Sequence, residues 1–166
     1  RKAFGEAATL NRGFGGSQYA DIVRYADRLI KPYQARAIVL YSGDNDLWHG
    51  KTPEEVHRDF LSVVKAIREH QADVPIVVIG VKPSIARRKI DDQIRQTNRL
   101  MAESTAMDAR MAFVDPYQFM LDGDGKANRA LFVGDGLHLN AAGYALWTPQ
   151  VQKAIDDLEA ATVAGE

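Results

Sequence analysis

Hydrophobic residues fall into two kinds of pattern along the chain, short continuous runs and longer periodic stretches. The two strongest continuous runs, residues 37–41 and 75–79, are rich in β-branched residues and do not alternate with polar ones. Continuous apolar strands of this kind are typical of a parallel sheet covered on both faces. Weaker strands are predicted at residues 8–11 and 111–115.

Between these runs, apolar residues recur every three or four positions, which predicts amphipathic helices. Helices are expected over residues 19–30, 53–69, about 90–105 and about 140–160. Thr52 and Pro53, followed by two glutamates, make a good helix start, because the threonine can cap the helix and the acids suit its N-terminal dipole. The alternation of strands and helices predicts a single α/β domain of three layers, α/β/α, with right-handed crossovers.

Composition narrows the possible functions without selecting one. The 166 residues are 46% hydrophobic and 26% charged, which suits one compact core, and the formal net charge of −1 gives no sign of nucleic-acid or membrane-surface binding. The absence of cysteine excludes disulfides, thiolate zinc sites and cysteine nucleophiles. No apolar run approaches the ~20 residues of a membrane span. We expect a soluble protein, cytoplasmic or exported, of undetermined oligomeric state.

Two polar or glycine-rich segments follow predicted strands, where sheets of this class place their chemistry. Residues 11–17, Asn-Arg-Gly-Phe-Gly-Gly-Ser, can form a tight strand-to-helix turn or present backbone N–H groups to an anion. Residues 43–46, Gly-Asp-Asn-Asp, can form a polar turn or offer the Asn45 amide to a developing oxyanion. The sequence alone leaves both interpretations open for each segment.

A third segment, before the last predicted helix, carries an Asp and a His three residues apart. On one helical turn, Asp135 can accept the Nδ1–H of His138 and hold one tautomer of the ring. Nε2 of His138 is then free to deprotonate a nucleophile. This spacing is typical of the base half of a hydrolytic triad.

Other motif-like segments favour ordinary structure. Residues 50–52, Gly-Lys-Thr, resemble the end of a phosphate loop, but Asn45 stands where that loop needs a glycine. Residues 122–126 open like a calcium loop and lack its later glycine and glutamate. We interpret a basic stretch as a solvated helix face; its residues are Arg87, Arg88, Lys89, Arg95 and Arg99. No metal or other cofactor is expected.

In chain order, these three segments resemble the blocks of the SGNH hydrolases, also called the GDSL esterase and lipase family. The resemblance implies a flavodoxin-like parallel sheet and serine-dependent hydrolysis of small acyl esters through an acyl-enzyme. By this match, the Gly16 backbone N–H and the Asn45 side-chain amide are oxyanion donors. The match makes His138 the general base and then acid, with Asp135 orienting its ring.

The serine block of that family has no counterpart in these residues. Residues 1–10 contain no serine, and neither Ser17 nor Ser42 matches the position of the nucleophile. We therefore expect the first strand of the fold to be absent from this chain, and its serine to lie upstream or on another segment. A non-catalytic ligand-binding domain that lost the nucleophile is the alternative. A flavodoxin-like nucleotide binder shares the topology but would need a phosphate loop.

Overall fold

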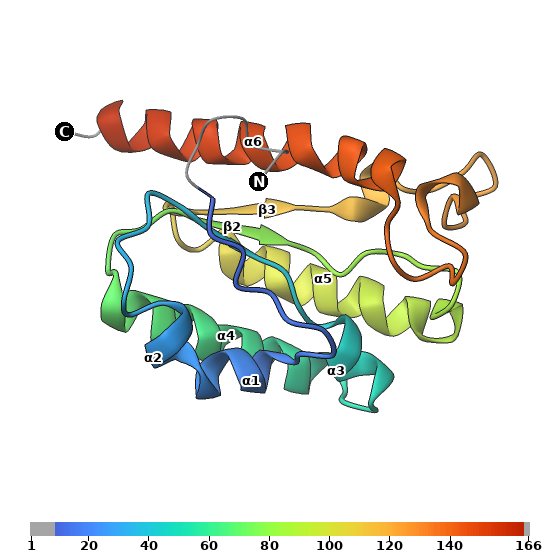
Figure 1. Cartoon of the computed structure of the whole chain (residues 1–166), viewed down its shortest axis with the longest axis horizontal. Helices are drawn as coiled ribbons and strands as arrows, with labels where there is room; N and C mark the ends of the chain where they lie inside the picture. Colours follow the sequence, from blue (N-terminus) through green and yellow to red (C-terminus); the bar gives the residue numbers. More distant parts are fainter. Residues whose placement is uncertain (1–8, 165–166) are drawn as a thin grey trace.

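The computed structural model describes residues 9–164 and is built around a three-stranded parallel sheet (Figure 1). Its strands are β1 (Ile38–Leu40), β2 (Ile76–Ile79) and β3 (Met111–Val114), in the order β1-β2-β3. Ile76 of the central strand is in register with Ile38 on one side and Met111 on the other. The α/β class and these three predicted strands are confirmed.

Helices connect and flank the strands. In chain order they are α1 (Tyr19–Arg24), α2 (Ala26–Leu29), α3 (Asp44–Trp48), α4 (Pro53–His70), the 3-10 helix η2 (Arg88–Ile90), α5 (Asp91–Thr105), the 3-10 helices η3 (Pro116–Gln118) and η4 (Arg129–Leu131), and α6 (Ala141–Ala164). Within residues 9–164, none of these helices combines the length and apolar character that crossing a bilayer requires.

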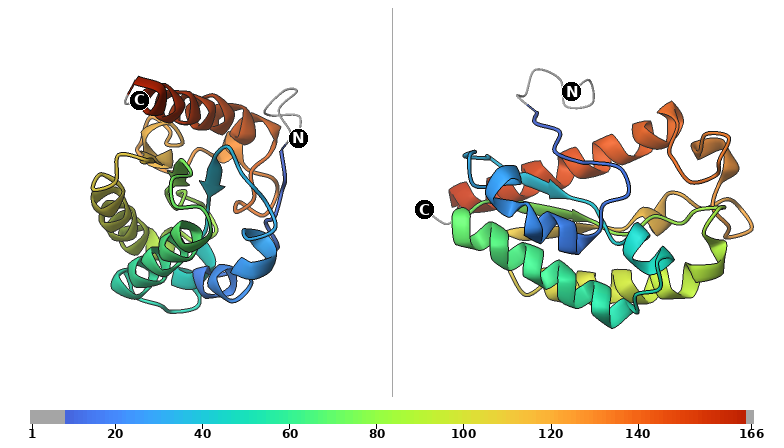
Figure 2. Two further views of the ribbon diagram at one scale, coloured as in Figure 1. Left: turned by 90° about the vertical axis from the view of Figure 1, so that its left-hand side faces the viewer. Right: turned by 60° about the horizontal axis from the view of Figure 1, so that its bottom comes forward.

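The sheet lies between two layers of helices, with α6 on one face and α4 and α5 on the other (Figures 1 and 2). Side chains of β2 alternate between the layers: Val77 and Ile79 belong to the core under α6, and Ile76 and Val78 to the core under α4 and α5. All four are buried. Burial of each such side chain contributes about 1.5–3 kcal/mol, which explains why the central strand has no polar residue.

The helix predictions succeed where a cap and a hydrophobic period agree. Thr52 Oγ1 accepts the Glu55 N–H at 3.3 Å, and Glu55 Oε2 accepts the Thr52 N–H at 2.8 Å, so a capping box starts α4. The helix predicted over residues 19–30 forms as two, α1 and α2. Tyr25, with φ −104° and ψ 13°, leaves helical geometry between them.

The prediction of a strand at residues 8–11 was wrong for residues 9–11, the part of it that the structure describes. Residues 9–11 form an irregular segment, and Ala8 lies outside the described residues. A strand requires a hydrogen-bonding neighbour, which a four-residue pattern does not contain. The strand order ends at β1, so its outer edge carries no strand from residues 9–164.

Candidate active site

A cleft of about 570 Å³ is lined by all three of the segments that the sequence singles out. Gly16 comes from the glycine segment, Asn45 from α3, and His138 from the loop before α6. In Figure 1 the arrows of β2 and β3 point toward the end of the molecule where α3 lies and where the chain enters α6, and β1 runs parallel to β2. The structure therefore brings Gly16, Asn45 and His138 to one cleft at the carboxyl end of the sheet.

Asp135 stands directly behind His138. Its Oδ2 lies 2.7 Å from Nδ1 of the ring, and its Oδ1 accepts the backbone N–H groups of Leu137 at 2.8 Å and His138 at 3.0 Å. The bond to the His138 side chain, followed by these two backbone bonds, holds the pKa of Asp135 well below its usual range. An ionised carboxylate can only accept, so Nδ1 carries the proton and Nε2 is free to accept one.

The backbone of this pair is a tight turn, which corrects the helical turn that the spacing suggested. Gly136 has φ +68°, a left-handed value that ends any helical turn. A Cβ there would also lie 3.0 Å from Nη1 of Arg129 and 3.1 Å from Cβ of Ile85. The Gly136 carbonyl accepts the N–H groups of Ile85 and Ala86, which ties the turn to the segment after β2.

The glycine segment approaches Asn45 through its backbone. Gly16 has φ +76°, and a Cβ placed on it would meet nothing within 4 Å, so conformation rather than crowding favours glycine. The Asn45 Nδ2 donates to the backbone carbonyl of Ser17 at 3.1 Å. This bond joins two segments 28 residues apart and ties the residue after Gly16 to the Asn45 amide.

Residues 43–46 form the start of α3, so of the two interpretations left open the plain polar turn does not describe their backbone. Gly43 precedes the helix with φ +102°. A Cβ at this position would lie 2.9 Å from Cγ2 of Val81 and 3.2 Å from Cε2 of Tyr19, so only glycine fits the junction. The glycine lets β1 turn at once into α3, and Asn45 consequently lies on the first turn of that helix.

Buried charges lie behind Asn45. The Asp44 carboxylate accepts Lys82 Nζ at 2.8 Å on Oδ2 and Arg87 Nη1 on Oδ1. Lys82 Nζ also donates to the Tyr41 hydroxyl at 3.2 Å. The side chains of Lys82 and Arg87 are 7% and 9% exposed. Ion pairing offsets the cost of removing these charges from water.

These charges were not found from the sequence. The interpretation of Arg87 as part of a solvated helix face is wrong, because Arg87 precedes η2 and is buried against Asp44. Lys82 carried no local signal at all. Their shared partner, Asp44, is 38 residues from Lys82 and 43 from Arg87 in the chain, so no short motif records the contact.

Two serines line the cleft, Ser17 and Ser42. In the part of the chain that the structure describes, neither is hydrogen-bonded to His138, and the Ser42 hydroxyl is buried without a hydrogen-bond partner. A separate pair, His57 Nε2 and Ser104 Oγ at 2.7 Å, links α4 to α5 and does not line the cleft. The nucleophile therefore stays unassigned among these serines.

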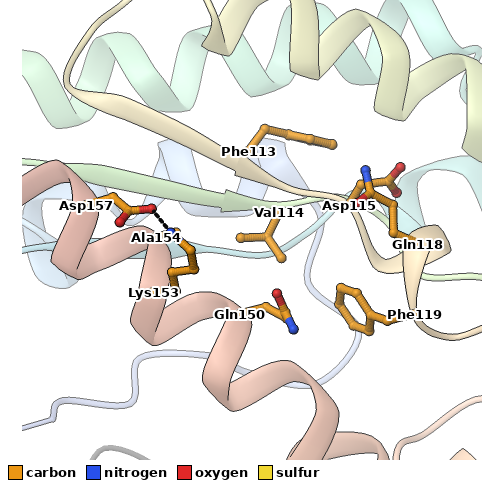
Figure 3. Close-up of a pocket in the computed structure, with 9 residues that line it drawn as sticks. All are labelled: Phe113, Val114, Asp115, Gln118, Phe119, Gln150, Lys153, Ala154 and Asp157. Carbon is orange, nitrogen blue, oxygen red and sulfur yellow. Dashed lines mark hydrogen bonds and ion pairs between the residues drawn. The ribbon is translucent and has the colours of Figure 1, made fainter.

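A second, smaller hollow of about 180 Å³ lies between β3 and α6 (Figure 3). Its lining includes Gln118 and an ion pair of Lys153 with Asp157 at 2.6 Å, and it contains no serine or histidine.

Residues 122–126, which open like a calcium loop in the sequence, form a turn in which Asp122 Oδ1 accepts two backbone N–H groups. Across residues 9–164, no three His, Asp or Glu side chains gather as metal ligands.

The sequence profile of the GDSL-like lipase/acylhydrolase family matches residues 1–146. The chain belongs to this family, and the family assigns it to the ester hydrolases. The resemblance inferred from the three segments is thereby confirmed. A comparison with curated protein sequences finds no significant match.

Several solved structures share the fold. A candidate platelet activating factor from Streptococcus pneumonia has a TM-score of 0.82 at 20% identity, over 93% of this chain and 76% of that one. A GDSL-like lipase from Bacteroides thetaiotaomicron has a TM-score of 0.72 at 21% identity, over 88% and 74%. A family 3 carbohydrate esterase from Clostridium thermocellum has a TM-score of 0.71 at 21% identity, over 89% and 70%. At identities of 20% and 21%, these comparisons show that the chain shares the fold of these proteins and nothing further.

Proposed function

We propose that the cleft hydrolyses small acyl esters through a covalent acyl-serine intermediate. The observation that carries the proposal is the 2.7 Å contact between Asp135 and His138, at a cleft that Gly16 and Asn45 also line. A base with a fixed tautomer and donors for a developing negative charge are the two parts that acyl transfer needs from the protein besides a nucleophile. No metal or cofactor takes part.

His138 Nε2 acts first as general base. A serine hydroxyl attacks the ester carbonyl while its proton passes to Nε2, and Asp135 stabilises the imidazolium that forms. The Gly16 N–H and the Asn45 Nδ2–H donate to the oxyanion, each donor contributing about 3–4 kcal/mol in the transition state. The imidazolium protonates the leaving oxygen as the ester bond breaks. Water then attacks the acyl group while Nε2 takes its proton, and the imidazolium passes that proton to the serine oxygen as the acyl bond breaks and the acid leaves.

The nucleophilic serine is assigned to a strand that pairs with the outer edge of β1, from outside residues 9–164. Support comes from that edge, which carries no strand from the described residues, and from Val39 of β1, which is 41% exposed. A parallel strand at this edge would end beside the cleft, where open α/β sheets carry their chemistry. It would also supply hydrogen-bond partners to the backbone N–H and C=O groups along that edge.

The walls of the cleft suit a small acyl ester. Tyr41 and Trp147 meet edge to face with their ring centroids 5.2 Å apart, and Leu139 and Tyr144 continue this apolar side. Short acyl esters, thioesters, lysophospholipids and O-acetyl groups on carbohydrates all fall within the proposed class. The lipase and the carbohydrate esterase of similar fold support that range.

Hydrolysis of p-nitrophenyl acetate by the full-length protein tests the proposal. We expect turnover with a burst of nitrophenol, and loss of turnover in His138→Ala. Lys153→Ala is the matched control, because Lys153 is exposed and lies in the second hollow, and it should keep wild-type rates. A protein that binds esters without any turnover would contradict the proposal and favour a non-catalytic ligand-binding domain.

A further inference from the structure

The Asn45 carboxamide is held in one orientation by two contacts of opposite kind. Its Oδ1 lies 2.9 Å from Arg87 Nη2, and its Nδ2 lies 3.1 Å from the Ser17 carbonyl oxygen. A guanidinium only donates and a carbonyl only accepts, so both contacts require the same assignment of the amide oxygen and nitrogen. The second Nδ2 hydrogen is thereby left for the cleft that Asn45 lines.

Arg87 is itself fixed from several sides. Its Nη1 donates to Asp44, its backbone N–H donates to Ser84 Oγ at 3.3 Å, and its guanidinium lies 5.4 Å from the ring centroid of Trp48. Asp44 is anchored in turn by Lys82. Burial disfavours the ammonium of Lys82, but Tyr41 and Asp44 outweigh it and raise the Lys82 pKa, so the anchor stays charged.

We propose that Arg87 is a positioning residue that aims the Asn45 Nδ2–H at the oxyanion. This inference rests on the proposed function of the cleft and goes beyond it by naming the residue that orients the donor. A charged donor on Oδ1 also polarises the amide and strengthens the bond that Nδ2 gives. Without Arg87, the carboxamide can turn its oxygen toward the cleft, where it would repel a developing negative charge.

The size of the effect follows from what still holds Asn45. A carboxamide that has lost Arg87 can still present Nδ2, because the Ser17 carbonyl continues to favour that orientation, so we expect a smaller cost than removal of the Asn45 donor, which is about 10²- to 10³-fold in kcat. We therefore expect Arg87→Met to lower kcat by about 10- to 100-fold. KM should change little, because the donor acts mainly in the transition state.

The kinetic test uses full-length enzyme and p-nitrophenyl acetate. Arg87→Met is compared with Arg88→Met, since Arg88 is the exposed neighbour of Arg87 in the chain. Arg88→Met should keep wild-type kcat. Arg87→Lys keeps the charge but not the fork that reaches Asp44 and Asn45 together, so it should remain slow. Added guanidinium ion should restore part of the Arg87→Met rate and none of the Asn45→Ala rate.

A double-mutant cycle separates positioning from a direct effect of the Arg87 charge. Asn45→Ala with Arg87→Met should be no slower than Asn45→Ala alone. If the two losses multiply instead, Arg87 does not act through Asn45 and the proposal is overturned. A melting temperature for each variant shows whether a slow variant has lost its fold.

A readout without activity keeps this inference distinct from the proposed function. In ¹⁵N-labelled wild-type protein, the Asn45 side-chain NH₂ should give two well-separated proton signals protected from exchange. Arg87→Met should shift these signals and speed their exchange, whereas Arg88→Met should not. Unchanged Asn45 signals in a folded Arg87→Met protein would overturn the proposal even if the wild-type protein hydrolysed no ester.

Discussion

The two sides of the cleft are held in place by opposite means. On the base side, the side chains of Asp135 and His138 are 47% and 75% exposed, and their bonds run within four residues of one loop. On the oxyanion side, Asn45 is held by Ser17 and Arg87, which are 28 and 42 residues away in the chain. The first side is a local turn open to solvent. The second is connected through Arg87 to the buried ion pairs that Asp44 makes with Lys82 and Arg87.

Under the proposed function, this contrast matches what each side would have to do. A general base has to meet solvent and substrate, so its geometry comes from short-range bonds that survive exposure. An oxyanion donor works best where water is excluded and its direction is fixed in advance. Long-range anchors in a buried cluster supply that fixed direction.

The largest expected effect is on the base side. Asp135→Asn should lower kcat by about 10⁴-fold, because the amide no longer holds the productive tautomer or stabilises the imidazolium. His138→Ala should be at least as severe. Steady-state kinetics of the full-length enzyme would measure both. Wild-type kcat in either variant would remove the pair from the mechanism.

The oxyanion side should respond less strongly. Asn45→Ala should lower kcat by about 10²- to 10³-fold with little change in KM, since a single donor is lost in the transition state. A purely structural Asn45 would give a lower melting temperature with wild-type kcat. Measuring both quantities on the same protein separates the two roles.

Gly43→Ala should expose how tightly the oxyanion side is packed. Gly50 has a similar φ of +94° with nothing within 4 Å of an added Cβ, so Gly50→Ala carries the backbone cost alone. Gly43→Ala adds contact with Val81 and Tyr19, and we expect an extra loss of about 1–3 kcal/mol in the free energy of unfolding. Urea unfolding of the two variants gives the difference. Equal losses would mean that the junction relaxes freely.

The smallest expected effect is on the pH profile of kcat/KM. It concerns the slope of the acid limb and not the maximum rate. The pKa of Asp135 is lowered, so its ionised form and the stability it confers persist above pH ~4 and are lost only below it. Asp135 should therefore make no contribution to the acid limb of kcat/KM, and the slope of that limb should be one. A slope of two in the pH range of that limb would show that a second group, such as Asp135, titrates as well.

The same contrast explains what the sequence could predict. Asp135 and His138 were found because their contact is encoded within four residues, and β2 because its burial on both faces leaves an unbroken apolar run. Arg87 and Lys82 were missed because their partner is distant in the chain. The strand expected at residues 8–11 failed for a related reason, since pairing depends on a neighbour that the local pattern does not describe.

The central claim is that one serine hydrolase site combines Asp135, His138, Gly16 and Asn45 with a serine from a strand beside β1. Labelling of the full-length protein with a fluorophosphonate, followed by peptide mass spectrometry, tests it most directly. The account predicts one modified serine outside residues 9–164, and loss of labelling in His138→Ala. Modification of Ser17 or Ser42, or labelling that persists without His138, would contradict it.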